Sequence, residues 1–330
     1  MPDRSVPGVV SRWMEVLEHA DRDRIASLRE RDEFFWLDLT DPSPEEVKGL
    51  GEALGLHPVA VEDTIEFGQR PKMDAYGDHM LFVYYTVRKG RDDEEALFEP
   101  VEIHIYISGG FIVTVRRAHC TELDALHDEL DEADAGAEDY IVYRVFDVLT
   151  DAFYPIIDLL EERIDALESR ILLQRPSHDQ LAETYRLKQK VHELSRRVVP
   201  QRDRFATGSD AILELPGLAR GAREYLRDVG DHLSQIASEL HRQQEDLTAL
   251  TATYFNANAN RLNAVATRLT IGGTFFLVWT LVTGFFGQNF EWLVSNVNTR
   301  HDFLLYGVGA LVVPTLIIGT LFWIKRKDWF

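Results

Sequence analysis

The chain has 330 residues, of which 45% are hydrophobic, and its formal net charge at pH 7 is −20. So acidic a protein is poorly suited to bind nucleic acid, because phosphate groups require a basic surface. Its single cysteine, Cys120, excludes an internal disulfide and a cysteine-based zinc cluster.

The charge is unevenly divided along the chain. Residues 262–330 carry five basic and three acidic residues, a balance of +2, which leaves 30 basic and 52 acidic residues, or −22, before them. An acidic body of this kind either attracts cations or is simply a solvated surface. The N-terminus lacks the apolar core of a secretory signal, so we expect the acidic part to remain in the cytoplasm.

Residues 1–150 have the pattern of a small mixed α/β domain. Short β-rich runs at 34–39, 80–87, 101–107 and 111–117 alternate with helical stretches such as 43–56. Ser43 is a predicted helix cap, because proline and two glutamates follow it. His104, in an alternating strand, is interpreted as a packed or surface histidine. The acidic segment 121–139 either attracts divalent cations or forms a solvated helix with Leu123, Leu126 and Leu130 turned inward.

From about residue 140 to residue 262 the periodicity becomes helical, and residues 151–261 are predicted to form a helical stalk. Residues 151–172 place five apolar side chains on one face, and a second helix fits 181–198. Glycine and proline break the pattern between 207 and 221. No proline then interrupts the chain until Pro314, so one helix is predicted from about Arg223 to Phe286, some 95 Å at about 1.5 Å per residue.

Two charge-free runs near the C-terminus, 269–290 and 303–324, are each long enough to cross a bilayer about 30 Å thick. We therefore predict a first transmembrane helix within 262–290, an extracytoplasmic loop at 291–302, a second transmembrane helix at 303–324 and a basic tail at 325–330. Basic residues flank the outer ends of this hairpin, which places both termini in the cytoplasm.

The first of these helices carries a stripe of polar or small residues along one face, and the stripe runs toward Gln288 and Asn289. Such a stripe either packs against another helix or faces water. Its members are Asn263, Thr267, Thr270, Thr274 and Gly284. One helix cannot enclose a water-filled pore, so a pore would require several copies around an axis, a cyclic homo-oligomer.

Three spaced motifs resemble the CorA-type divalent metal-ion channels, also called the two-transmembrane GxN transporters. The segment HPVAVEDTIEFGQRPKMDAYGDHMLFVYY (57–85) is similar to the family's "HP…ED…QRPK" stretch, and RDVGDHLSQI (227–236) is similar to its long helix. TGFFGQNFEW (283–292) occupies the place of its GMN signature, with GQN at 287–289. The resemblance implies an α+β cytoplasmic domain built as an αβα sandwich, long stalk helices, and a funnel-shaped homopentamer with a pore lined by the first transmembrane helix.

The resemblance also implies roles for individual residues. Gly287, Gln288 and Asn289 would form the selectivity filter, with Asn289 as its outer ring. The residues implied to line the pore are Asn263, Leu269, Leu277, Thr280 and Gly284, among which Leu269 and Leu277 resemble gate rings. Asp228 falls on an acidic position that helps to bind regulatory Mg²⁺ between subunits.

The sequence departs from the family's pattern at two places. Gln288 replaces the methionine of the signature, either adding a second amide ring or packing the loop. Arg88 stands where relatives supply an acidic partner to the regulatory site, so an Arg88–Asp228 ion pair is a possible replacement for the bridging metal.

We expect a passive, membrane-potential-driven channel for Mg²⁺ uptake in the plasma (inner) membrane, with Co²⁺ or Ni²⁺ as further ions and no cofactor. A Zn²⁺ transporter of the same fold is the alternative, although the conduit offers no histidine or cysteine. A non-conducting membrane-anchored scaffold or sensor is the alternative of another class. An enzyme is not expected, because no catalytic constellation occurs.

Overall fold

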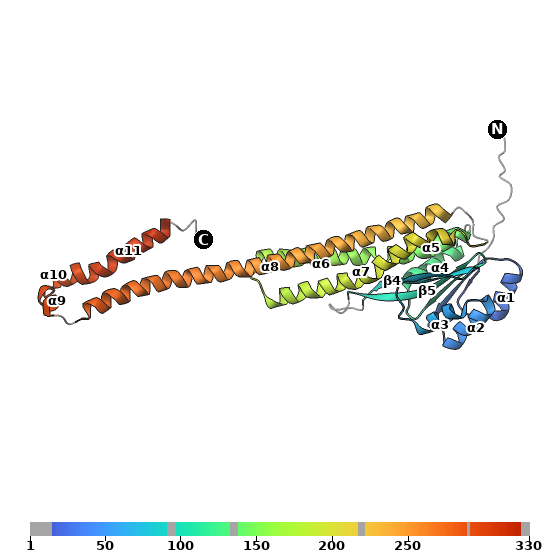
Figure 1. Cartoon of the computed structure of the whole chain (residues 1–330), viewed down its shortest axis with the longest axis horizontal. Coiled ribbons are helices and arrows are strands. Elements are labelled where there is room, and N and C mark those ends of the chain that lie inside the picture. The colour runs from blue at the N-terminus through green and yellow to red at the C-terminus, as the bar shows by residue number, and fades with distance from the viewer. Residues whose placement is uncertain (1–14, 91–96, 133–137, 217–221, 289–290, 325–330) are drawn as a thin grey trace, which may run out of the picture. The chain divides into compact units, whose positions relative to one another are not determined.

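The computed structural model describes residues 15–90, 97–132, 138–216, 222–288 and 291–324 (Figure 1). Its N-terminal elements, in chain order, are β1 (Glu15–Leu17), α1 (Arg22–Glu30), β2 (Phe35–Thr40), α2 (Pro44–Leu54), α3 (Pro58–Glu66), β3 (Lys72–Ala75), β4 (His79–Lys89), β5 (Phe98–Ser108) and β6 (Phe111–Arg116). The helical part comprises α4 (Thr121–Glu132), α5 (Glu138–Asp151), α6 (Tyr154–Leu173), α7 (His178–Ile212), α8 (Ala222–Phe286), α9 (Glu291–Asn296), α10 (Arg300–Asp302), the π-helix η1 (Phe303–Val308) and α11 (Gly309–Ile324).

The six strands form one mixed sheet in the order β1-β2-β6-β5-β4-β3. β1, β2 and β6 run parallel to one another, whereas β3, β4 and β5 pair antiparallel with their neighbours. The two long strands β4 and β5 are buried over most of their length, because helices cover both faces of the sheet.

Alternate residues of the strands enter two separate cores. Trp36 and Ile112 face a core completed by α4, α5, α7 and the start of α8. Their neighbours Phe35 and Val113 face the opposite core, which α1, α2 and α3 complete. The period of two along each strand thus sends apolar side chains to both faces. The three layers confirm the expected αβα sandwich.

Several local predictions are confirmed. The Ser43 hydroxyl accepts a hydrogen bond from the Glu46 amide and the Glu46 carboxylate accepts one from the Ser43 amide, a capping box that begins α2. In the acidic helix α4 the three leucines are buried, as predicted for a solvated amphipathic helix. His104 is also buried and hydrogen-bonded on both ring nitrogens.

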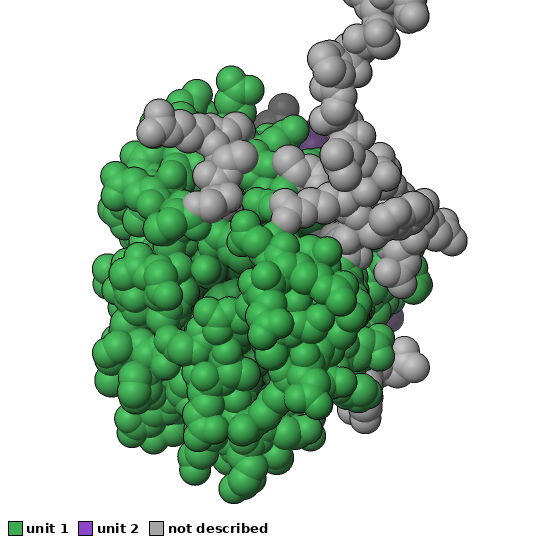
Figure 2. Space-filling view, turned by 90° about the vertical axis from the view of Figure 1, so that its right-hand side faces the viewer, with its two compact units in different colours: residues 1–170, 179–250 green, residues 171–178, 251–330 purple. Residues whose placement is uncertain are grey.

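The chain divides into two compact units, which Figure 2 colours separately. Unit 1 contains residues 1–170 and 179–250, and unit 2 contains residues 171–178 and 251–330. The domain boundary predicted near residue 150 therefore falls inside unit 1. The physical reason is that Phe205 of α7 and Leu226 and Val229 of α8 pack into the same core as the sheet. The 65-residue helix α8 belongs to both units.

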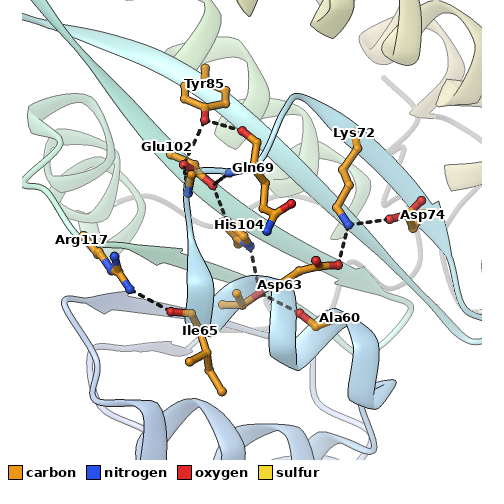
Figure 3. A network of polar contacts seen from close by, with 12 residues as sticks. Ala60, Asp63, Ile65, Gln69, Lys72, Asp74, Tyr85, Glu102, His104 and Arg117 are labelled. Carbon is orange, nitrogen blue, oxygen red and sulfur yellow. Dashed lines mark hydrogen bonds and ion pairs between the residues drawn. The ribbon is translucent and has the colours of Figure 1, made fainter.

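The segment 57–72, which carries the first family motif, is fastened to the sheet by a polar network (Figure 3). Glu102 of β5 accepts hydrogen bonds from the backbone amides of Gly68 and Gln69, at 2.7 and 3.0 Å. His104 joins Glu102 to the Thr64 hydroxyl through contacts of 2.9 Å at each ring nitrogen. These bonds hold a sharp turn in which Gly68 has a φ of 75°.

A second part of this network fixes the start of β3. The Lys72 ammonium contacts the carboxylates of Asp63 and Asp74 at 2.5 and 3.1 Å. Burial lowers the pKa of Lys72, but the two carboxylates outweigh it and leave this pKa raised. Asp63, Lys72 and the backbone of Gln69 are therefore structural members of the "ED…QRPK" segment, since their polar groups are bonded inside unit 1.

We predict that Glu102→Gln destabilises unit 1 by about 1–3 kcal/mol at neutral pH, because the amides of Gly68 and Gln69 and the ring of His104 lose a charged acceptor. Burial raises the pKa of Glu102, but hydrogen bonds from His104 and Gln69 more than offset this and lower it. The stabilisation is thus present above the unfolded pKa of about 4.3 and disappears as the pH falls through the lower folded pKa.

Thermal unfolding of the detergent-solubilised protein followed by circular dichroism measures the effect. The difference between wild type and variant should shrink as the pH falls below about 4. Glu62→Gln, on the exposed face of α3, is the matched control and should leave the melting temperature unchanged. An equal loss in both variants at pH 7 would contradict the network's role.

Candidate functional site

Unit 2 contains two helical stretches that are long and apolar enough to cross a membrane, one ending α8 at Phe286 and the other spanning Arg300–Ile324. Large apolar side chains stand exposed along both of them in the single chain. Leu269 and Leu277 are 72% and 73% exposed. Surfaces this apolar must be covered by lipid or by other copies of the chain.

One face of α8 is turned toward α11 inside unit 2. The Trp279 indole nitrogen donates a hydrogen bond of 2.9 Å to the Thr315 hydroxyl. The rings of Phe275 and Phe322 lie 6.4 Å apart between centroids. A cavity of about 500 Å³ at the end of the same face is lined by Phe286 and by residues of η1 and α11. Trp279 therefore marks the side of α8 that packs on its neighbour.

The predicted pore-lining residues lie away from this packed side. With about 100° per residue along an α-helix, Asn263, Leu277 and Gly284 fall about 140–160° around the axis from Trp279. Leu269 and Thr280 fall about 80–100° from it, on the flank of the same face. The helix thus presents one face to α11 and a different face, which carries the polar stripe, outward from the hairpin.

The threonines of the stripe all use their hydroxyl hydrogens in the same way. Each donates to the backbone carbonyl four residues earlier, at 2.7–2.9 Å, as seen at Thr267, Thr270, Thr274 and Thr280. A hydroxyl whose hydrogen is engaged presents only oxygen lone pairs to its surroundings. This face therefore offers hydrogen-bond acceptors, which suit the water hydrogens of a hydrated cation.

The signature residues follow directly on the end of α8. The Gly287 amide donates to the Thr283 carbonyl at 2.9 Å, and Gln288 is exposed. A Cβ at position 287 would lie 3.1 Å from that same carbonyl oxygen, so the close backbone approach favours glycine. Asn289 lies outside the residues that the structure describes.

The link between the two apolar helices is more ordered than the predicted loop. It contains the short helix α9 and a capping box at α10, in which the Thr299 hydroxyl accepts from the Asp302 amide at 3.2 Å. Glu291 begins α9, so its carboxylate lies at a helix N-terminus, where negative charge is stabilised.

A second cluster of polar residues lies in unit 1 where α5 packs on α8, around the predicted regulatory position Asp228. Three side chains each place one potential ligand atom within 4.8 Å of the other two, an arrangement that could hold a metal ion; they are Asp147, Asp151 and His232. His232 Nδ1 is 3.4 Å from an oxygen of Asp151, and His232 Nε2 is 3.8 Å from an oxygen of Asp228. The Tyr143 hydroxyl donates to Asp228 at 3.2 Å.

The electrostatics of this cluster favour a bound cation. Burial, followed by the charge of Asp147, raises the pKa of Asp151 and outweighs the lowering effects of His232 and Arg144. Burial, followed by the charge of Asp147, likewise raises the pKa of Tyr143. His232 Nδ1 is buried and has no hydrogen-bond partner among the described residues. Arg144 already forms an ion pair of 2.8 Å with Asp147, and a divalent cation would offset the remaining negative charge of Asp151 and Asp228.

Arg88 is engaged elsewhere in the chain. It forms an ion pair with Glu99, its register partner on β5, with an Nε to Oε2 distance of 2.9 Å. Among the described residues of one chain Arg88 forms no ion pair with Asp228, and an ion pair between these residues of different subunits stays a prediction. Sequence reasoning missed Asp147, Asp151 and His232. The sequence does contain one indication of this cluster, because Asp147 and Asp151, and likewise Asp228 and His232, are four residues apart and so share a helix face.

A sequence profile described as "CorA-like Mg2+ transporter protein" matches residues 31–326. The chain belongs to the CorA family. It is therefore a divalent-cation transporter of the membrane, which confirms the expectation of a transporter rather than an enzyme.

Individual CorA relatives match nearly the whole chain. A putative metal ion transporter of Bacillus subtilis, YfjQ, is 29% identical over 90% of this chain and 90% of its own. The cobalt/magnesium transport protein CorA of Thermotoga maritima is 24% identical over 94% of this chain and 87% of its own. The solved CorA magnesium transporter of Methanocaldococcus jannaschii, 20% identical, has the same fold, with a TM-score of 0.73 over 89% of this chain and 91% of that one.

We predict that Trp279→Phe loosens the pairing of α8 with α11, because the hydrogen bond from the Trp279 indole to the Thr315 hydroxyl is lost. Interhelical hydrogen bonds in membranes contribute about 0.6–1.7 kcal/mol. The melting temperature of the protein in lipid nanodiscs should fall accordingly. Trp323→Phe, at an exposed position of α11, is the control, and an equal fall there would contradict the assignment.

Proposed function

We propose that this CorA protein is a passive channel for Mg²⁺ uptake, assembled as a homopentamer with α8 around the pore and a ring of Asn289 amides as the filter. The observation that carries the proposal is the geometry of α8. Its packed side, marked by Trp279, faces α11, while Asn263, Leu277 and Gly284 lie on the far side. Several copies arranged with α11 outward would therefore bring the polar stripes together around a central axis.

The chemistry of the stripe and the signature suits Mg²⁺. This ion dehydrates reluctantly and keeps several waters, so neutral oxygens that accept hydrogen bonds from those waters bind it without trapping it. Threonine hydroxyls with engaged hydrogens, and the amide oxygen of Asn289, are such acceptors. Gln288 would pack and hydrogen-bond the same turn.

Gating and driving force also follow from known physics. Rings of Leu269 and Leu277 would stop ions by dewetting when the α8 helices close together. With both termini in the cytoplasm of a plasma-membrane protein, a membrane potential of about 100 mV favours entry of a double charge by about 4.6 kcal/mol. Uptake then needs no hydrolysis of nucleotide.

The names of the relatives support Mg²⁺, with Co²⁺ as a further ion. The Thermotoga protein is named a cobalt/magnesium transport protein, and the Methanocaldococcus structure a magnesium transporter. Ni²⁺ is chemically close to Co²⁺ and would share its path. Zn²⁺ prefers nitrogen and sulfur ligands, and neither histidine nor cysteine occurs among the proposed pore-lining residues.

The cluster at α5 and α8 would serve as the regulatory metal site. Asp228 was expected to bind Mg²⁺ between subunits, and within one chain Asp147, Asp151 and His232 lie near it, making a set of three carboxylates and one imidazole. A divalent ion held there would bind α5 to α8 and so fix the helix that reaches the pore. Arg88, paired with Glu99, need not replace the ion.

We predict that Asn289→Ala lowers Mg²⁺ flux by about tenfold or more, since each subunit loses a hydrogen bond of about 1.5 kcal/mol or more to the hydrated ion. Fluorescent-dye uptake into proteoliposomes at a fixed potential measures the flux, with Zn²⁺ assayed alongside. Asn298→Ala, an amide in the same link, is the matched control and should conduct normally. Unchanged Mg²⁺ flux and selectivity in Asn289→Ala would refute the filter assignment.

We predict that Asp151→Asn combined with Asp228→Asn weakens binding of Co²⁺ and Mg²⁺ to the full-length protein by about tenfold or more, because two charged ligands are lost. Calorimetric titration measures the affinity. Flux should also persist at internal Mg²⁺ concentrations that silence the wild type. Asp231→Asn, exposed on the same helix, should behave as wild type. Wild-type affinity and inhibition in the double variant would contradict regulation through this cluster.

A further inference from the structure

A basic groove lies between α6 and α7 in unit 1, although the chain as a whole is strongly acidic. Four cationic side chains line it together with two carboxylates, a local balance of +2. The charged lining residues are Arg163, Arg170, Glu183, Arg186, Lys190 and Glu193. The groove has a volume of about 660 Å³, within the range of small-molecule sites.

The groove follows from the spacing of its cations. Arg163 and Arg170 are seven residues apart on α6, and Arg186 and Lys190 are four apart on α7, so each pair lies on one face of its helix. The Gln180 side chain donates to the Arg170 carbonyl at 3.2 Å, which ties the two helices together beside the groove. The aliphatic side chain of Leu187, itself buried, contributes to the apolar part of the lining.

The cations of the groove fall into two kinds. Arg170 and Lys190 are held in place by carboxylates of the groove itself, Glu183 at 2.5 Å and Glu193 at 3.3 Å. Arg163 and Arg186 make no ion pair with any residue in the described ranges, although Arg163 is half-buried. Among the described residues that line the groove, two guanidinium groups beside two anchored cations therefore leave a net positive charge.

We propose that this groove binds a soluble polyphosphate, such as the phosphate chain of a nucleoside triphosphate. A guanidinium presents a planar fork of donors that matches phosphate oxygens, and two such groups from facing helices suit a chain of phosphates. The net charge of −20 repels anions at long range. A ligand must therefore carry several negative charges in a small volume to gain from the groove.

The test uses the full-length protein in nanodiscs of zwitterionic lipid at about 0.15 M ionic strength, titrated calorimetrically with ATP and with inorganic tripolyphosphate. We expect saturable binding of both probes. The double variant Arg163→Ala, Arg186→Ala should bind them about tenfold or more weakly, because two charged donors are lost.

The matched control is Arg196→Ala, Arg204→Ala, which removes the same charge from exposed positions of α7 outside the groove and should bind as wild type. Absence of saturable binding in the wild type, or equal weakening in both double variants, would overturn the proposal. A second result would also overturn it: neither ATP nor tripolyphosphate binds, but anionic phospholipid in the discs raises the melting temperature of the wild type more than that of the double variant Arg163→Ala, Arg186→Ala. That result would identify a lipid headgroup as the occupant.

Discussion

The architecture depends on the uneven packing around one helix, α8, which has one covered side and a largely exposed remainder. Residues 269–286 of α8 are free of charge, and among the described residues of unit 2 it is the side carrying Trp279 that packs on α11. The remaining surface combines exposed leucines with acceptor oxygens of threonine and asparagine. Lipid or neighbouring copies of the chain can cover the leucines, whereas the oxygens gain hydrogen-bond donors only from water or from polar groups of other copies.

The α/β layers give this helix its fixed end. Leu226, Val229 and Leu233 of α8 enter the core against the sheet, which holds the first turns of the helix in a defined rotation. Asp228 and His232 lie between these buried positions, so the same rotation turns them toward Asp147 and Asp151 on α5. A cation at this cluster would therefore act on an element that continues, without a break, to the signature residues.

Local charge, rather than the total, decides which ions each region attracts. The cluster between α5 and α8 brings three carboxylates together, and burial raises the pKa of one of them, Asp151. The groove between α6 and α7 has the opposite sign within the same acidic unit, because its arginines outnumber their carboxylate partners. The two proposed sites lie on different helix pairs and would attract ligands of opposite charge.

The sequence by itself determined the elements whose cause is local. The capping box at Ser43, the inward leucines of α4 and the extent of α8 each follow from residues close together in the chain, and the charge-free runs identify the membrane helices by length alone. Asn289 was likewise chosen from its motif, and its role remains a proposal.

Tertiary structure decided which distant residues meet. Glu102 anchors the turn at Gly68, α7 and α8 join the core of the sheet, and His232 faces Asp151. Strand register and helix rotation set these contacts, and neither can be read from a short stretch of sequence.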